Sequence, residues 1–434
     1  MGPPPRRLRL SNSRCSRADA RVTAYPLHNA SADEWSDWRW QMRHRVHDEA
    51  TLARYVRLTD GEREAIARTA GLFRWTITPY YASLMDPVDP ACPVRRHVVP
   101  QRAEVEPDIV GVVDPLDEVG HSPVKNLVHN YPDKVAFCVT SECAVYCRYC
   151  LRKRMVGDAD FMMRKDELRE AIAYIAATPA IRDVLLTGGD PLVFSDDNLD
   201  WLLGALRAIP HVEVVRIGSR LPVVCPMRIT DGLLAVLARH KPVWLNTHFN
   251  HPKELTREAA SACERLADAG VPVGNQSVLL AGINDDADTL KRLNEGLVAA
   301  RVRPYYLYHA QLIGGTPHFR TPIEDGLAIM RRLRGHTSGF AVPAYVLDTP
   351  DGKVPLTRDY VLGRAGDHVV IQTTRGTLWA EPNPLPPGWT GEALPEIAMP
   401  AGARTVPTGA PTFVHGDAIG ASLIRAAVSG ARRA

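Results

Sequence analysis

The feature that most constrains this chain is a regular alternation of short apolar runs and amphipathic segments that begins at Lys134. Seven runs are rich in β-branched or aromatic residues and are bounded by turn residues: KVAFCVT, RDVLLTGG, VEVVRIG, PVWLNTHF, VPVGNQSVL, RPYYLYHAQ and AYVLDT. Helical patterns such as KDELREAIAYIAATPA and TREAASACERLADAG lie between most of them. This order predicts parallel strands joined by crossover helices, in a full or partial (β/α) barrel or a doubly wound sheet.

The regions on either side of this repeat differ from it in composition. Residues 1–22 are rich in Pro, Arg and Ser, which is typical of a disordered tail or, as the weaker reading, of an organelle transit peptide. Residues 23–130 contain helical spacing of Trp35, Trp38 and Trp40 and predict a small helical domain, followed by a linker formed by the Pro-rich stretches 86–99 and 114–123. Residues 131–350 form the predicted barrel. Residues 351–434 are expected to supply short strands, a flap and a tail.

Charge and hydropathy exclude several classes of protein. Fifty-two basic and forty-nine acidic residues leave a net charge of +3, which offers no electrostatic basis for binding nucleic acid or a membrane surface. No apolar run reaches the length of about 18 to 20 residues that a membrane-spanning helix needs, and no secretory signal is seen. We therefore expect a cytoplasmic protein whose partners are small molecules.

Three of the eight cysteines are concentrated in one segment, directly after the first predicted barrel strand. Cys143, Cys147 and Cys150 form a CxxxCxxC pattern. A structural zinc ion takes four closed ligands, whereas three thiolates on an iron–sulfur cubane leave one iron open to an external ligand. Three buried cysteines, or a zinc site completed by a distant residue such as His129, are the alternatives.

The cysteine pattern, with an aromatic residue before the last cysteine, resembles that of radical S-adenosylmethionine (SAM) enzymes. That resemblance implies a [4Fe-4S] cluster whose open iron binds SAM. The next predicted strand ends in TGGDP, which is similar to the glycine-rich segment of the family that receives the methionyl ammonium. By itself such a segment is a common turn, but its place one βα unit after the cysteines strengthens the resemblance.

From about Trp35 to about Tyr360 the sequence resembles one family, the lysine 2,3-aminomutases. Matching segments include YPDKV, TSECAVYCRYCLRKRMVGD, RDVLLTGGDPLVFSD, GVPVGNQSVLLAGIND, RVRPYYLYHAQL and AYVLDTPDGKVPL. The resemblance implies a partial (β/α)6 barrel, and it implies pyridoxal 5′-phosphate (PLP) alongside SAM. Lys353 matches the lysine that forms the Schiff base with PLP, a role that requires an amine.

The same resemblance assigns further site residues. SAM-binding positions are Gly188, Gly189, Asp190, His248 and Gln276. PLP-binding positions are Asn130, Tyr131 and Lys134, beside Lys353. Substrate-binding positions are Arg152 for the α-carboxylate, and Gln311 and Asp348 for the distal group.

Two departures from the family concern charge. Arginine is usual where Asn130 and Lys134 stand; Lys134 keeps a charge for the phosphate, whereas Asn130 cannot supply one. In the family two aspartates bind the distal ammonium of lysine. One of them matches Asp348, and Gln311 stands in place of the other. A buried cation with one carboxylate fewer is costly, whereas a guanidinium could bond to both Asp348 and the Gln311 carbonyl. The residues therefore favour arginine slightly over lysine, and a modified basic amino acid is a further candidate. An acidic side chain is disfavoured, because Asp348 would repel it.

The predicted reaction is a 2,3-aminomutase reaction, in which the α-amino group moves to C3 and gives a β-amino acid. Radical elimination, as in a dehydratase or deaminase, is the alternative outcome, and a non-enzymatic iron–sulfur or zinc module is the alternative class. Asp286 stands where the family has a zinc-ligating cysteine, and no cysteine follows Cys263, so no structural zinc is expected. A flavodoxin or ferredoxin as electron donor and a homo-oligomer are also expected.

Overall fold

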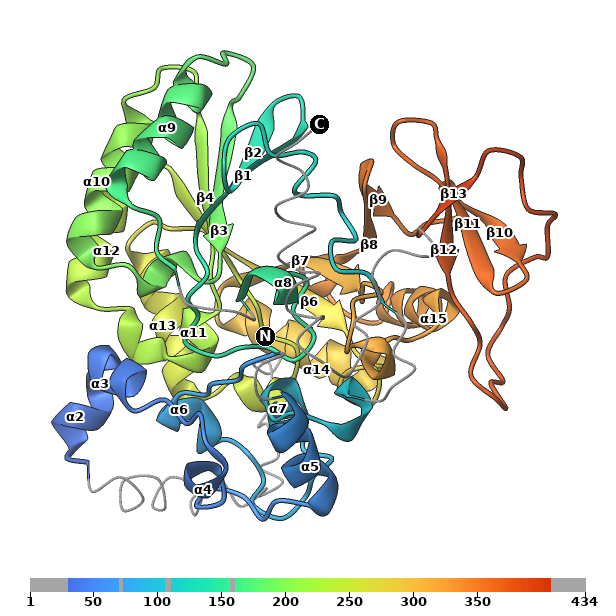
Figure 1. The fold of residues 1–434 in the computed structure, drawn as a ribbon, viewed down its shortest axis with the longest axis horizontal. Coiled ribbons are helices and arrows are strands. Elements are labelled where there is room, and N and C mark those ends of the chain that lie inside the picture. Colours follow the sequence, from blue (N-terminus) through green and yellow to red (C-terminus); the bar gives the residue numbers. More distant parts are fainter. Residues whose placement is uncertain (1–29, 70–72, 106–110, 157–160, 407–434) are drawn as a thin grey trace, which may run out of the picture.

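A computed structural model describes residues 30–69, 73–105, 111–156 and 161–406 of the 434-residue chain (Figure 1). The predicted tail of residues 1–22 and the end of the chain after residue 406 lie outside the described residues. Within them the strands form two sheets, one of nine strands in the order β1 to β9 and one of four strands in the order β10 to β13.

The main sheet follows the predicted alternation. Its strands are β1 (Leu127–Tyr131), β2 (Lys134–Thr140), β3 (Asp183–Gly188), β4 (Val214–Gly218), β5 (Val243–Thr247), β6 (Val273–Leu279), β7 (Val302–His309), β8 (Ala344–Thr349) and β9 (Gly352–Pro355). Strands β2 to β8 are parallel and lie in sequence order, and each corresponds to one of the seven predicted runs. Strands β1 and β9 pair antiparallel at the two edges. The sheet curves into a nearly closed partial barrel of the radical SAM type, which confirms the predicted fold class and excludes the doubly wound sheet.

Six helices make the crossovers between the parallel strands. They are α9 (Lys165–Ala176), α10 (Asp196–Arg207), α12 (Asp231–Arg239), α13 (Arg257–Asp268), α14 (Ala287–Ala299) and α15 (Ile323–Leu333). Polar N-caps start four of them, because the side chains of Ser195, Thr230, Thr256 and Asp286 each accept a hydrogen bond from a first-turn N–H. Figure 1 shows α9, α10 and α12 along the outer face of the strands.

The core lies between these helices and the sheet. Val184, Val215 and Val243 are fully buried neighbours on β3, β4 and β5, where the backbone register places them side by side. The crossover helices turn their leucines toward such residues, as α14 does with Leu293 and Leu297. Burial of both faces explains why the strands read as continuous apolar runs.

Short helices fill the joints of the barrel. They are α8 (Lys153–Val156), η2 (Pro191–Val193), α11 (Leu221–Val224), η3 (Pro226–Arg228), η4 (Pro252–Glu254), η5 (Pro317–Phe319) and η6 (Gly339–Ala341). Four of the five 3₁₀ segments among them begin with a proline, whose fixed φ suits the first position of a helical turn.

The N-terminal region is helical, as predicted. Its elements are α2 (Ala32–Ser36), α3 (Trp38–Arg43), α4 (Glu49–Leu52), α5 (Asp60–Thr69), α6 (Pro79–Ala82), α7 (Pro93–Val98) and η1 (Arg102–Glu104). Trp35, Trp38 and Trp40 are buried. Part of the stretch 86–99, predicted as linker, forms α7, because Pro93 starts a helical turn whose Val94 and Val98 are fully buried. In Figure 1 these helices lie below the barrel.

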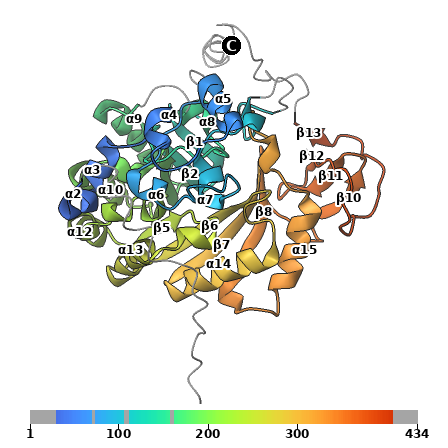
Figure 2. The same cartoon turned by 90° about the horizontal axis from the view of Figure 1, so that it is seen from below.

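The C-terminal part adds a small sheet of β10 (Val361–Ala365), β11 (His368–Gln372), β12 (Leu378–Pro382) and β13 (Arg404–Thr405). Figure 1 shows this sheet beside β8 and β9, and Figure 2 shows it beside β8 from below. No helix among the described residues is long and apolar enough to cross a membrane.

The two edge strands of the main sheet, β1 and β9, meet without a backbone ladder among the described residues. Side chains join them instead. The backbone N–H of Lys353 donates to Tyr131 Oη at 2.7 Å, and Asn130 Nδ2 donates to the carbonyl of Pro350 at 2.9 Å. We call this junction of β1 and β9 the seam. It brings three predicted coenzyme residues together.

Candidate active site

The three clustered cysteines lie in the loop that follows β2, at the carboxyl end of the first parallel strand. Cys143, Cys147 and Cys150 are half-buried, and no disulfide joins them to another described cysteine. The Cys150 N–H donates to the carbonyl of Cys147 at 3.2 Å, which closes a tight turn between them. Burial and the neighbouring Cys147 raise the pKa of the Cys150 thiol to about 11. Iron binding at this loop must therefore displace a proton.

The arrangement fits a cluster better than a single metal ion. Among the described residues, no three His, Cys, Asp or Glu side chains are placed to ligate one ion. A cubane does not require such a site, because each of its cysteines binds a different iron. Arg220 Nε, just beyond β4, and Thr247 Oγ1, at the last residue of β5, are buried without a hydrogen-bond partner in the described chain. They are available to a polar ligand at this edge of the barrel.

Arg220 is the side chain that connects the cysteine loop to the barrel. Its Nη1 donates to Cys147 Sγ at 2.6 Å, and its Nη2 donates to Glu254 Oε1 at 2.7 Å and to Tyr81 Oη at 3.0 Å. Burial opposes ionisation of Glu254, but His97 and Arg220 lower the pKa of its carboxyl to about 2. The Glu254 carboxylate therefore holds the guanidinium beside the cysteine sulfur.

The glycine-rich segment at the end of β3 seats the cysteine loop. Gly188 has φ of +124°, and a Cβ on Gly189 would lie 2.3 Å from the carbonyl oxygen of Glu142. Only glycine permits this approach of two backbones. Asp190 donates its N–H to the same carbonyl at 2.8 Å, while its carboxylate accepts from the N–H of Arg220 at 2.8 Å. Burial raises the pKa of Asp190.

His248 and Gln276, the other two positions expected near SAM, lie together. His248 follows β5, Gln276 lies on β6, and His248 forms a hydrogen bond with the backbone of Gln276. Burial and the charge of Arg220 lower the pKa of His248 to about 3, so the imidazole is neutral. Its Nε2 lies 3.0 Å from the hydroxyl of Tyr149, which stands between the second and third cysteines. The histidine is thus in contact with the cysteine loop.

Arg152, expected to bind the substrate carboxylate, is paired with a carboxylate of the protein. Its Nε and Nη2 donate to Glu118 at 3.1 and 2.8 Å, and its Nη1 donates to Thr187 Oγ1 at 3.0 Å. Arg154 Nη2 also donates to Glu118, at 2.7 Å. Burial opposes ionisation of Glu118, but the two arginines lower its pKa. Glu118 therefore occupies the Nε–Nη2 edge of the Arg152 guanidinium. The remaining nitrogen, Nη1, donates to the hydroxyl of Thr187, which another acceptor could replace.

Lys353 lies on β9 directly opposite Asp348 on β8, and the two side chains form an ion pair. The ammonium also lies 4.2 Å from the ring centre of Tyr308 and 5.1 Å from that of Tyr306. Burial opposes the charge, but Asp348 and Tyr308 raise the pKa of Lys353. The amine must lose this proton before it can attack a carbonyl carbon.

The predicted phosphate-binding residues gather at the seam. Lys134 Nζ lies 4.1 Å from the ring centre of Tyr131, and Tyr131 accepts the Lys353 N–H described above. Asn130, on the same short β1 strand, is contacted by Arg375 from the turn between β11 and β12. Two cations, Lys134 on β2 and Arg375 from the small sheet, therefore lie at the hairpin that the resemblance associates with a phosphate.

The structure also brings together the two residues predicted to choose the substrate. Gln311 follows β7, and its Nε2 donates to the backbone carbonyl of Asp348 at 2.8 Å. With its amide nitrogen engaged, Gln311 presents its carbonyl oxygen as the remaining acceptor. Asp348 therefore contributes a carboxylate to this neighbourhood, and Gln311 contributes a neutral acceptor.

Three functional contacts were missed by sequence reasoning: Arg220 on Cys147, Glu118 on Arg152, and Arg375 on Asn130. Arg220 could have been found, because it lies two residues beyond a predicted strand, where barrel sites are built. Glu118 lies in a stretch interpreted as linker. Arg375 lies 245 residues from its partner, and no local pattern marks it.

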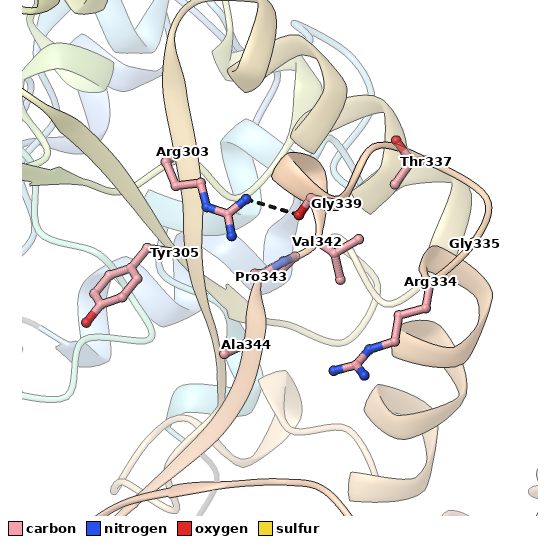
Figure 3. Close-up of a pocket in the computed structure, with 9 residues that line it drawn as sticks. All are labelled: Arg303, Tyr305, Arg334, Gly335, Thr337, Gly339, Val342, Pro343 and Ala344. Carbon is pink, nitrogen blue, oxygen red and sulfur yellow. Dashed lines mark hydrogen bonds between the residues drawn. The ribbon is translucent and has the colours of Figure 1, made fainter.

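A separate pocket of ≈ 590 Å³ lies at the opposite ends of β7 and β8 (Figure 3). Arg303 and Arg334 line it, and Arg303 Nη1 donates to the carbonyl of Gly339 at 3.1 Å. Arg303 and Ala344 lie at the amino ends of β7 and β8, whereas the cysteine loop lies at the carboxyl ends of the parallel strands. This pocket is therefore remote from the cysteine loop.

Comparison with known protein families matches two parts of the chain. Residues 137–293 match the model of the radical SAM superfamily, and residues 330–419 match the model described as lysine-2,3-aminomutase. The first match contains the three cysteines and the glycine-rich segment, and the second contains Lys353. Membership in the radical SAM superfamily implies a [4Fe-4S] cluster and SAM.

Individual relatives are similar over most of their length. L-lysine 2,3-aminomutase of Fusobacterium nucleatum is 49% identical over 82% of this chain and 84% of its own. The L-lysine 2,3-aminomutase of Clostridium subterminale is 48% identical over 83% of this chain and 88% of its own. Glutamate 2,3-aminomutase of Clostridioides difficile is 44% identical over 81% of this chain and 83% of its own.

Among solved structures, Streptococcus suis SuiB bound to S-adenosylmethionine overlaps 50% of this chain and 51% of its own, with a TM-score of 0.40 and 12% identity. The aminomutases of Fusobacterium nucleatum and Clostridium subterminale, at 49% and 48% identity, show the family of this chain. The chain belongs to the lysine 2,3-aminomutase family of the radical SAM superfamily and is an aminomutase, an isomerase.

Proposed function

We propose that this enzyme moves the α-amino group of a basic L-amino acid to C3, with arginine preferred to lysine, and that it uses PLP bound at Lys353. The observation that carries the choice of substrate is the contact between Gln311 and Asp348, which leaves one carboxylate and one amide oxygen for the distal group. When bound, the cluster and SAM supply a carbon-centred radical, and PLP supplies a carbonyl carbon for the migrating nitrogen.

Arg152 is the residue that would hold the α-carboxylate of the substrate. Glu118 fixes the edge of its guanidinium formed by Nε and Nη2, so the group cannot rotate away. Within the part of the chain that the structure describes, Nη1 donates to the hydroxyl of Thr187, and a carboxylate is the stronger acceptor. A bound substrate would therefore lie next to the cysteine loop, because Arg152 follows Cys150 by two residues.

Asp348 and Gln311 would hold the distal end of the substrate. Asp348 pairs with the Lys353 ammonium, and the distal cation of a bound substrate would compete with that amine for the same carboxylate. A guanidinium presents several N–H groups in one plane, so it can donate to the Asp348 carboxylate and to Gln311 Oε1 together. A lysine ammonium is a more strongly hydrated point charge than a guanidinium, so it loses more when an amide replaces one of two carboxylate partners. The carboxylate of glutamate would be repelled by Asp348.

Overall identity does not choose between these substrates, because relatives named for lysine and for glutamate are similarly close to this chain. The local residues therefore support the proposal of a basic substrate. We also propose a cytoplasmic homo-oligomer that receives its electron from a flavodoxin or ferredoxin.

The experiment that tests this function is anaerobic. The protein is reconstituted with iron, sulfide and PLP, mixed with SAM and a reductant, and supplied with arginine, lysine or glutamate; products are identified by mass spectrometry. An isomer of arginine with unchanged mass is expected. Isomerisation of lysine alone would contradict the preference for arginine, and isomerisation of glutamate would contradict a basic substrate. A product lighter by water or ammonia would show elimination.

A variant examines the substrate contact directly. Gln311→Asp restores a second carboxylate, so the ratio of kcat/KM for lysine to that for arginine should rise about tenfold, as expected for a charge contact in a closed site. Gln372→Asp is the matched control, because Gln372 is exposed on β11 of the small sheet. An unchanged ratio in Gln311→Asp would remove this residue from the choice of substrate.

A further inference from the structure

Arg375 reaches from the small C-terminal sheet to the seam of the barrel. It lies in the turn between β11 and β12, and its Nη2 donates to both oxygen atoms of Asn130, the side-chain Oδ1 at 2.8 Å and the backbone carbonyl. Both bonds use one nitrogen. The Nε and Nη1 donors of Arg375 therefore remain for another acceptor within the described chain.

The residues around this guanidinium are those expected to bind the phosphate of PLP. Tyr131 follows Asn130 on β1, Lys134 Nζ lies 4.1 Å from the Tyr131 ring centre, and Tyr131 Oη accepts the N–H of Lys353. The carboxylate near this group is that of Asp351, and it is already engaged by Thr377 and Arg404. Arg375 is thus a cation at the seam whose nearest bonded partner, Asn130, is neutral.

We propose that Arg375 supplies the second phosphate-binding cation of the coenzyme site, replacing the arginine that is absent at position 130. This inference rests on the proposed function, because it requires PLP at Lys353. Lys134 belongs to the hairpin and Arg375 reaches it from the small sheet, and a phosphate dianion between them would have one point charge and one guanidinium as partners. Asn130 orients the guanidinium through its two oxygen atoms.

The test measures coenzyme affinity without any turnover. The visible absorbance of coenzyme joined to Lys353 is titrated with PLP and, separately, with pyridoxal, which has the same aldehyde but no phosphate. Arg375→Gln should weaken PLP binding about tenfold, the loss expected for one charge-assisted contact, and should leave pyridoxal binding unchanged. A misfolded variant would lose both ligands, so the pair of titrations separates loss of contact from loss of fold.

A second experiment asks whether an arginine at position 130 restores the affinity for PLP. The double variant with Asn130→Arg and Arg375→Gln returns the cation to the barrel strand, and it should recover most of the lost affinity for PLP. Arg358→Gln is the matched control, because Arg358 is exposed on the loop between β9 and β10. It should bind PLP like the wild type.

Two outcomes are distinguishable. If the wild type shows PLP absorbance that depends on Lys353, and Arg375→Gln binds PLP with wild-type affinity, the role of Arg375 is overturned and the proposed function stands. If the wild type shows no absorbance that depends on Lys353, the proposed function fails together with this inference.

Discussion

Glu104 is the buried anion behind the cysteine loop, and its removal should destabilise the fold severely. Its carboxylate accepts from Arg148 Nη2 at 2.7 Å and from Lys153 Nζ at 3.2 Å, and all three side chains are at most 4% exposed. Arg148 and Lys153 both belong to the segment around Cys150. Glu104→Gln keeps the shape but leaves two buried cations without a counter-charge.

The magnitude follows from the pKa of the carboxyl. Burial opposes ionisation of Glu104, yet Arg148 and Lys153 lower its pKa to about 2. Against an ordinary value of about 4.3, this shift corresponds to about 3 kcal/mol of folding free energy. Breaking a buried ion pair costs about 3–5 kcal/mol in general. Burial and Arg148 also lower the pKa of Lys153 to about 8, because one carboxylate cannot fully compensate two buried cations.

Guanidinium denaturation at pH 7, followed by circular dichroism, should show the free energy of unfolding of Glu104→Gln reduced by about 3–5 kcal/mol. The folded pKa is depressed, so the contribution is complete above about pH 4.5 and disappears as the pH falls through the folded value. The variant should lack that acid-dependent loss. Glu213→Gln, which breaks an exposed pair with Arg182, is the control and should unfold like the wild type. A loss below about 1 kcal/mol, typical of a solvated pair, would refute the reasoning.

Three further changes address the site itself. Asp348→Asn removes the carboxylate that raises the pKa of Lys353, so the rate of PLP attachment, which rises with pH, should rise at lower pH than in the wild type; an unchanged stopped-flow profile would contradict this. Gly189→Ala places a Cβ 2.3 Å from the Glu142 carbonyl, so it should cost about 1–3 kcal/mol and lower the iron content after reconstitution; normal iron content would show that the loop can shift. Cys147→Ala should abolish cluster absorbance and 5′-deoxyadenosine formation but keep PLP absorbance, since Lys353 lies on a different strand; loss of both cofactors would point to misfolding.

The strands of the barrel could be predicted because each is a short apolar run between turn residues, and burial on both faces requires that pattern. The positions of the three cysteines, Gly188 and Lys353 relative to the strands could be predicted because each belongs to a local segment, and their roles stay predictions. The charged residues that contact this region from distant parts of the sequence could not be predicted. Glu118 joins Arg152 across 34 residues, and Arg220 joins Cys147 across 73. A single charged residue belongs to no repeating pattern in the sequence, so the sequence does not indicate which distant residue it contacts.

Asn130 is a second case in which the local sequence could not identify a distant partner. The sequence indicated that a charge is absent from this position, and that observation is correct for the strand taken by itself. The cation in contact with it comes from a turn of another sheet. Local sequence reports what a segment lacks, whereas the fold decides which distant segment compensates for it.

The seam between β1 and β9 also determines when the site can form during synthesis. Tyr131 and Lys353 are 222 residues apart, and Asn130 and Arg375 are 245 residues apart. Contacts of such high sequence separation form late, because the loop between them must be ordered first. A ribosome that has completed β7 has released most of the hydrophobic core, but only the β1–β2 side of the proposed coenzyme site. We expect the barrel to collapse during translation, and coenzyme binding to become possible only after Arg375 has left the exit tunnel.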